Sequence, residues 1–213
     1  MTVQYQQTSS SPSRVIVALH GWTGNADSMQ SIAGAFGFSD TLWIFPQAPY
    51  SASPGGFSWY DGDKISGWKH TASFSLLDKL VQEQFENGFA ANDLFLLGFS
   101  QGASLVLEYM VRQSFSMAGV IAIAGFIHDK KRFVRETTPE SKNSRVLLIH
   151  GEKDQVIYPS ASEKAHKLLH QSGYQSELQI LQSSHKVSLS AKPLIEKFLT
   201  FIYFRGKNLI IIS

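Results

Sequence analysis

The stretch 93–110, DLFLLGFSQGASLVLEYM, joins an apolar run to a segment with helical spacing through Gly98-Phe99-Ser100-Gln101-Gly102. In a sharp turn between a strand and a helix, the residues beside the central serine must be glycine or small, because larger side chains clash. A helix beginning at Gln101 would point its first amides at the Ser100 oxygen, where negative charge develops in acyl transfer. The pentapeptide alone also fits an ordinary glycine-rich turn, but this setting predicts a nucleophilic Ser100.

Similar apolar runs of strand length recur along the chain, with segments of helical spacing between them. Most runs are continuously apolar, which is typical of parallel strands covered by helices on both faces. We therefore predict an α/β fold with a mostly parallel, twisted sheet and an active site at the carboxyl ends of its strands. The predicted strands are 14–21, 42–49, 93–100, 118–125, 145–152 and 176–183, and the predicted helices are 74–86, 101–113, 160–171 and 191–204.

The 213 residues, 43% of them hydrophobic and 17% charged, have the profile of one globular domain, which we assign to 1–213. The connection 128–144 is too short for a lid, so no cap domain is expected. The long irregular stretch 46–71 is rich in aromatic residues, which favours an ordered, functional loop. We predict substrate contacts from this loop and from the turn after the first strand: Trp22, Tyr50, Phe57, Trp59 and Trp68.

Composition excludes several classes of function. The formal net charge is +2, with 19 basic and 17 acidic residues spread along the chain, so nucleic acid is not an expected partner. The absence of cysteine excludes disulfides, thiolate metal sites and a cysteine nucleophile. No metal-binding histidine pattern and no phosphate-binding glycine motif is present, so neither a metal nor a cofactor is expected.

The two ends of the sequence give no sign of a membrane anchor. The start, MTVQYQQTSSSPSR, lacks a basic region followed by an apolar stretch, which predicts a cytoplasmic protein. The final residues, RGKNLIIIS, are too short to cross a bilayer, and we assign them no function. We expect no stable membrane insertion and a monomer or homodimer.

A serine hydroxyl needs a general base within hydrogen-bond reach, and a third group that holds the base in one tautomer. In this class of fold the acid and then the histidine follow the serine along the chain. His185 follows the last predicted strand, where a loop can hold an imidazole above the sheet, and we predict it as the base rather than a surface histidine. His150 ends an apolar strand, which favours packing or turn geometry, whereas His166 and His170 share one helix face.

Two aspartates are candidates for the acid. Asp154 lies just beyond the predicted strand 145–152, which puts its carboxylate at the same sheet edge as Ser100. Asp129 follows the preceding strand but lies beside Lys130 and Lys131, where a solvated residue is the simpler interpretation. We therefore predict Asp154 as the acid.

The oxyanion hole should combine the amide after the nucleophile, here that of Gln101, with an amide from the loop after an early strand. In the segment LHGWTG from Leu19, the turn at His20-Gly21 leaves the Trp22 amide free. The alternative is an ordinary turn followed by a helix cap. We predict Trp22 and Gln101 as the two donors.

Six pieces of the sequence, in order along most of the chain, resemble the phospholipase/carboxylesterase family of α/β hydrolases, which includes acyl-protein thioesterases and small bacterial carboxylesterases. They are LHGWTGN at Leu19, FPQAP at Phe45, WYD at Trp59, GFSQGA at Gly98, HGEKDQVIYP at His150 and the late His185. The resemblance implies hydrolysis of carboxylic esters or thioesters through an acyl-enzyme, without a cap or cofactor. It carries the roles of nucleophile, acid, base and oxyanion amides to Ser100, Asp154, His185, Trp22 and Gln101.

The sequence departs from the family pattern at three positions. Asn25 replaces a frequent acidic residue, Ala103 replaces a common glycine, and Ser184 replaces the glycine that usually precedes the histidine. None of these changes removes a predicted catalytic group. Two other functions stay open: a peptidase or C–C bond hydrolase with the same three residues, and a ligand-sensing homologue with slow turnover.

Overall fold

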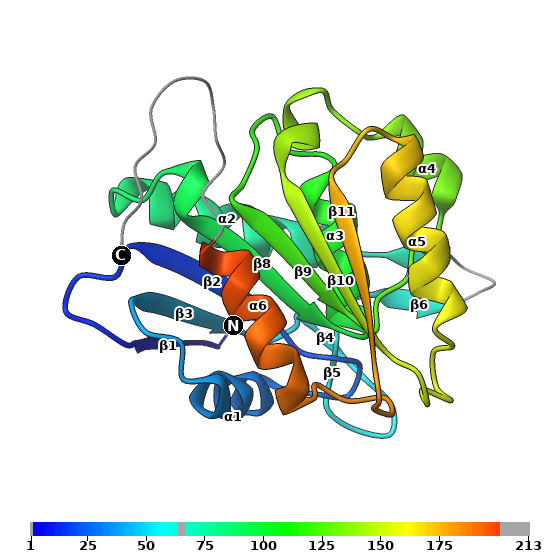
Figure 1. Cartoon of the computed structure of the whole chain (residues 1–213), viewed down its shortest axis with the longest axis horizontal. Coiled ribbons are helices and arrows are strands. Elements are labelled where there is room, and N and C mark those ends of the chain that lie inside the picture. The colour runs from blue at the N-terminus through cyan, green and yellow to red at the C-terminus, as the bar shows by residue number, and fades with distance from the viewer. Residues whose placement is uncertain (1, 64–66, 201–213) are drawn as a thin grey trace.

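The main sheet of the computed structural model, which describes residues 2–63 and 67–200, has seven strands in the order β1-β3-β2-β8-β9-β10-β11 (Figure 1). The edge strand β1 runs antiparallel to β3, and every other neighbouring pair is parallel. The strands are β1 (Val3–Gln7), β2 (Arg14–Leu19), β3 (Thr41–Pro46), β8 (Leu94–Phe99), β9 (Gly119–Ile123), β10 (Arg145–Gly151) and β11 (Ser176–Leu181). The predicted mostly parallel α/β sheet is confirmed. Of its strands only β1 was not predicted, because its sequence VQYQQ is polar, in keeping with its half-exposed place at the edge of the sheet.

Helices cover both faces of this sheet, as expected. Residues of α1 and α6 pack in one apolar cluster, and residues of α2, α3 and α5 pack in the cluster on the other face. Figure 1 shows α6 in front of the sheet and α3 behind it. These helices are α1 (Ala26–Phe36), α2 (Thr71–Glu86), α3 (Gln101–Met110), α5 (Ser160–Gln171) and α6 (Lys192–Thr200). Of the predicted helix 191–204, residues 201–204 lie outside the described part of the chain, as does the tail RGKNLIIIS.

Helix α1 was not predicted from the sequence, although its first residue is marked by a strong cap. The Asn25 side chain accepts a hydrogen bond from the Ser28 amide at 3.0 Å, and the Ser28 hydroxyl lies near the Asn25 backbone, which forms a capping box. The helix ends at Phe36 and is capped by Gly37, whose φ of 59° lies in the left-handed region that favours glycine. Asn25, the first departure from the family pattern, therefore begins a helix.

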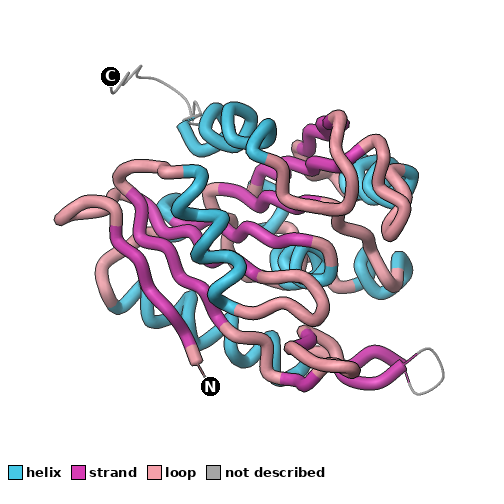
Figure 2. Tube along the Cα trace, turned by 90° about the horizontal axis from the view of Figure 1, so that it is seen from below, coloured by secondary structure: helices cyan, strands magenta, loops and turns pink. Residues whose placement is uncertain are grey.

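The aromatic stretch 46–71 forms two short hairpins. Strands β4 (Tyr50–Ser51) and β5 (Phe57–Ser58) form the first, and β6 (Asp61–Asp63) and β7 (Gly67–Lys69) form the second. Figure 2 shows β6 and β7 projecting from the body of the protein. The first hairpin lies against the turn after β2, because the Thr23 amide donates to the Phe57 carbonyl at 2.9 Å.

The connection between β9 and β10 holds a short helix, α4 (Lys130–Arg135), and a 3₁₀ turn, Glu140–Asn143. Asp129 caps α4 by accepting the Arg132 amide at 2.9 Å. Among the described helices, none is long and apolar enough to cross a membrane.

Candidate active site

Ser100 lies in a strained turn at the carboxyl end of β8. Its φ of 53° and ψ of −114° are rare for a residue with a side chain, and α3 begins at the next residue. A Cβ at Gly98 would lie 2.4 Å from the Gly102 carbonyl oxygen, and one at Gly102 would lie 2.5 Å from that of His20. The two glycines therefore permit the close approach that exposes Ser100, as the sequence pattern predicts.

Ser100, His185 and Asp154 come together in one hydrogen-bonded chain. His185 Nε2 lies 3.0 Å from the Ser100 hydroxyl, and His185 Nδ1 lies 2.6 Å from Asp154 Oδ2. The three residues come from the ends of β8, β11 and β10. A carboxylate accepts only, so Nδ1 carries a proton and Nε2 of a neutral ring can accept one from the serine. This arrangement is chemically suited to nucleophilic attack by Ser100.

The Asp154 carboxylate is buried and receives several donors. Its Oδ1 accepts the amides of Val156 and Ile157, each at 2.9 Å. Burial alone would raise the pKa of Asp154, but the hydrogen bonds from His185 and from these two amides lower it below its usual value. The carboxylate is therefore held in its charged form. Asp129, the rival candidate, is exposed and occupied as the cap of α4.

The loop that carries His185 packs against the end of β10. A Cβ at Gly151 would lie 2.4 Å from the Ser183 carbonyl oxygen, so this backbone contact requires glycine. Ser184 is not among the described non-glycine residues with positive φ, so its side chain causes no strain there. Ala103, the second departure from the family pattern, is buried in α3 opposite Gly125.

The two predicted oxyanion amides come from the elbow itself and from the turn after β2. Gln101 is the first residue of α3, and Trp22 lies in the turn after β2. In the described part of the chain, neither amide donates to a protein acceptor. Both amides are therefore free to donate to another acceptor.

The side chain of Gln101 has a role that the sequence did not reveal. Its Oε1 accepts the Trp59 amide at 2.8 Å, and its Nε2 donates to the Ser58 hydroxyl at 3.0 Å. Gln101 thus ties the elbow to the last residue of β5 and to the residue that follows it. No local pattern could identify these partners, since they lie more than forty residues earlier.

Trp59 requires a correction. Its side chain is fully buried, and its indole N–H donates to the His20 carbonyl at 2.8 Å. The ring also packs 5.0 Å from the imidazole of His20. Trp59 therefore supports the turn after β2 from inside the protein, and this replaces the expected contact with substrate.

The other predicted aromatic contacts are more accessible. Trp22 is 55% exposed, Phe57 38% and Trp68 37%. Tyr50 is half-buried, and its hydroxyl accepts the Ala72 amide at 3.1 Å, at the start of α2. Trp22, Phe57 and Trp68 are thus open to solvent, whereas Tyr50 holds its hairpin to α2.

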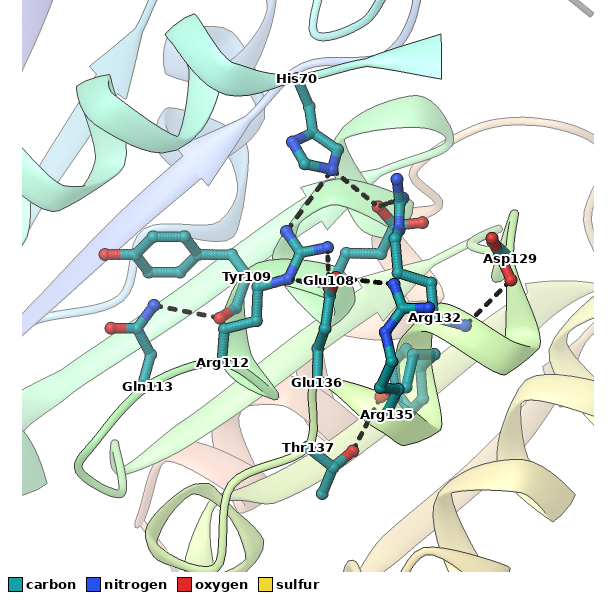
Figure 3. A network of polar contacts seen from close by, with 11 residues as sticks. His70, Glu108, Tyr109, Arg112, Gln113, Asp129, Arg132, Arg135, Glu136 and Thr137 are labelled. Carbon is teal, nitrogen blue, oxygen red and sulfur yellow. Dashed lines mark hydrogen bonds and ion pairs between the residues drawn. The ribbon is translucent and has the colours of Figure 1, made fainter. Parts of the chain in front are cut away.

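Polar residues anchor α3 to α4 and to the start of α2, as Figure 3 shows. The buried Glu108 of α3 pairs with Arg132 of α4 at 2.9 Å and lies 3.9 Å from His70 Nε2. Arg112 pairs with Glu136 and lies 3.5 Å from the same histidine nitrogen. Burial raises the pKa of Glu108, and the two arginines oppose that shift. The network fixes the helix whose first turn faces Ser100.

A cavity of about 340 Å³ lies beside the acid turn, which is the turn 152–158 after β10 that carries Asp154. The start of the β9–β10 connection and α5 form its other walls. Its lining is mostly apolar, with Lys130 and Lys164 among its residues, and it includes Val156 and Ile157, whose amides hold Asp154. Ser100 and His185 do not line it. Among the described residues, no group of three histidine, cysteine or acidic side chains is arranged to hold a metal ion.

Comparison with known proteins identifies the family of this chain. A family model described as phospholipase/carboxylesterase matches residues 3–203. The chain belongs to this family. The resemblance noted in the sequence is therefore confirmed at the level of the family.

Curated relatives carry the names of thioesterases and carboxylesterases. Acyl-protein thioesterase 1 of Kluyveromyces lactis is 29% identical over 72% of this chain and 74% of its own length. Acyl-protein thioesterase 1 homolog 2 of Dictyostelium discoideum is 27% identical over 84% of this chain and 86% of its own. The family and these relatives support a hydrolase of the carboxylesterase and thioesterase type.

Solved structures show the same fold. Esterase PE8 superposes with a TM-score of 0.81 at 24% identity, covering 93% of this chain and 96% of its own. SOBER1 of Arabidopsis thaliana gives 0.78 at 21% identity, covering 87% and 97%. The predicted α/β-hydrolase fold is therefore confirmed.

Proposed function

We propose that this protein hydrolyses carboxylic esters or thioesters through an acyl-enzyme on Ser100. The observation that carries the proposal is the chain of hydrogen bonds from Ser100 through His185 to Asp154, at 3.0 and 2.6 Å. His185 Nε2 accepts the serine proton as the hydroxyl attacks the acyl carbon, and later returns a proton to the leaving group. Asp154 holds the imidazole in the required tautomer and stabilises its charged form.

The tetrahedral intermediate places negative charge on the former carbonyl oxygen. The amides of Trp22 and Gln101 are the proposed donors to that oxygen, and the N-terminus of α3 adds its partial positive charge. Water then enters as the second nucleophile, with His185 acting as base once more. The same three residues would serve other acyl substrates, so peptide and C–C bond hydrolysis stay as alternatives. The cytoplasmic location and the monomeric or homodimeric state stay predictions.

Covalent labelling with a fluorophosphonate, together with a panel of p-nitrophenyl esters, acyl thioesters and peptides, tests the proposal. The intact protein should label once and should turn over esters or thioesters. Ser100→Ala should lose both labelling and turnover while its circular dichroism and unfolding temperature stay near those of the parent. Labelling that persists in this variant would refute Ser100 as the nucleophile. Turnover of peptides, with no turnover of esters or thioesters by the intact protein, would make the substrate a peptide instead.

A further inference from the structure

His20 is buried two residues before Trp22, whose amide is a proposed oxyanion donor. Its Nδ1 lies 2.7 Å from the Gly21 carbonyl oxygen, and because a carbonyl only accepts, Nδ1 must carry the ring proton. Its Nε2 accepts the Ala48 amide at 3.2 Å. These partners select a neutral imidazole with the proton on Nδ1. Burial also lowers the pKa of His20, which keeps the ring neutral.

Gln47 reinforces the same tautomer. Its Oε1 accepts the Ala26 amide at 3.3 Å, which turns its Nε2 donor toward His20 Nε2 at 3.0 Å. The Ala26 amide belongs to the first residue of α1. A continuous chain of hydrogen bonds therefore runs from the first amide of α1 through Gln47 and His20 to the Gly21 carbonyl.

The Gly21 carbonyl and the Trp22 N–H belong to one peptide unit. This peptide is trans, and in a trans peptide the C=O and N–H bonds point in opposite directions from a rigid plane. Holding the carbonyl oxygen on the side of His20 therefore directs the Trp22 N–H to the other side. Gly24 contributes a second donor to the same oxygen, at 3.0 Å.

Gly21, which supplies the carbonyl of this peptide, is a glycine, so the peptide plane needs a hydrogen bond such as that from His20 to restrain its rotation. With no Cβ, Gly21 permits rotation of the plane at little cost. A Cβ at Gly21 would lie 3.1 Å from the Phe99 ring and 3.4 Å from the Ser100 Cβ, so a larger residue would crowd the elbow. Gly21 by itself would let the peptide plane rotate, and the buried side chain of His20 restrains that plane.

We propose that His20 is a positioning residue that orients the Trp22 amide toward the oxyanion through its hydrogen bond to the Gly21 carbonyl. The inference rests on the proposed function, because it concerns stabilisation of the tetrahedral intermediate. A donor that is already oriented stabilises the developing charge without reorganisation, and removing one such donor costs about 10²–10³ in kcat. A misoriented donor should cost part of this, about 10- to 100-fold.

Two amide substitutions separate this role from simple packing. In His20→Asn the side-chain amide can reach the position of Nδ1 and keep a donor to Gly21, but it loses the acceptor for Ala48. In His20→Gln the longer amide reaches the position of Nε2 and keeps the Ala48 contact, but it loses the donor to Gly21. A role limited to packing predicts that the second variant, which preserves the inter-loop contacts, is at least as active as the first.

The experiment measures kcat and KM of both variants on one p-nitrophenyl ester, at a temperature below both unfolding midpoints. We expect His20→Gln to lose about 10- to 100-fold in kcat with KM changed less than about threefold, and His20→Asn to retain clearly more. Binding of a boronic acid that forms a tetrahedral adduct on Ser100 should weaken in the same order. Equal kcat in the two variants, or activity that follows unfolding temperature, would overturn the proposal. If the unmodified protein neither labels nor turns over esters, the proposed function fails instead.

Discussion

His150 Nε2 lies 3.2 Å from Asp154 Oδ2, the same oxygen that accepts the hydrogen bond of His185. Both side chains of this pair are fully buried. The same nitrogen lies 2.8 Å from the Ile157 carbonyl, and Nδ1 lies 2.7 Å from the Ser162 hydroxyl. The expected role of His150 in turn geometry is thus specific: it connects the end of β10 to the acid turn and to α5.

From these contacts we predict that His150→Phe destabilises the protein and lowers kcat. The substitution removes the His150 partner of the Ile157 carbonyl and one of the two hydrogen bonds of the Ser162 hydroxyl, which keeps only its bond to the Gly125 carbonyl. A buried polar group left unsatisfied costs about 1–3 kcal/mol. The matched control is His166→Phe, since within the described residues the half-buried His166 of α5 makes one hydrogen bond, to Ser176 at the start of β11. Urea unfolding and ester kinetics of the two variants check the prediction, and equal stability losses would contradict it.

The second prediction distinguishes the two candidate acids. Asp154→Asn should lower kcat by about 10⁴, because an amide cannot hold His185 in the tautomer that accepts the Ser100 proton. Asp129→Asn should change kcat little, since asparagine also caps helices. Initial rates on a p-nitrophenyl ester measure both. A large loss of kcat in the Asp129 variant with a small loss in the Asp154 variant would identify Asp129 as the acid.

The third prediction concerns acid stability. Burial first, and the charge of Arg132 second, lower the pKa of His128 to about 4. Below pH about 6.5 the unfolded chain binds a proton at this residue, whereas the folded chain does not until about pH 4. Stability should therefore fall as the pH drops through this window, by about 1 kcal/mol per pH unit.

Urea unfolding at pH 7, 6 and 5 measures this slope. His128→Phe keeps the ring against Tyr60 and Phe126 but removes the proton site, so its slope should be shallower than that of the parent. His70 acts in the same direction, because burial and two arginines lower its pKa to about 4 as well. Identical slopes in parent and His128→Phe would refute the assignment.

The elbow could be predicted from sequence because its signals are local. The apolar run before Ser100 predicts a strand, the glycines beside Ser100 predict a tight turn, and the helical spacing after it predicts a helix. Asp154 and His185 followed from their places after predicted strands. The burial of Trp59 could not be predicted, because its aromatic character suits a core and a binding surface equally well. The roles of His20 and of the Gln101 side chain depend on partners brought near by the fold, such as Ala48 and Trp59, and no spacing in the sequence encodes these contacts.

The last prediction concerns acyl chain length, and it follows from how open the proposed site is. Trp22, in the turn after β2, and Phe57, in β5, are both substantially exposed, and the bond from the Thr23 amide to the Phe57 carbonyl joins the two segments. The connection between β9 and β10 contains a six-residue helix, α4, with four charged residues. Each methylene that these aromatic side chains cover should contribute about 0.8 kcal/mol, which is about fourfold in kcat/KM. Each methylene beyond them stays in water and contributes nothing.

The preference for longer esters should therefore rise and then level off at short to medium chains. Kinetics on p-nitrophenyl esters of increasing length measure the length at which the plateau begins, and Trp22→Ala should shorten it. Tyr5→Ala, at a similarly exposed aromatic residue on the edge strand β1, is the control and should leave the plateau unchanged. Because the site is open, the rate should show no jump when the substrate exceeds its solubility limit. A sharp rise on emulsified long-chain triglycerides would mean that a cover opens at a lipid surface, and would refute the open site.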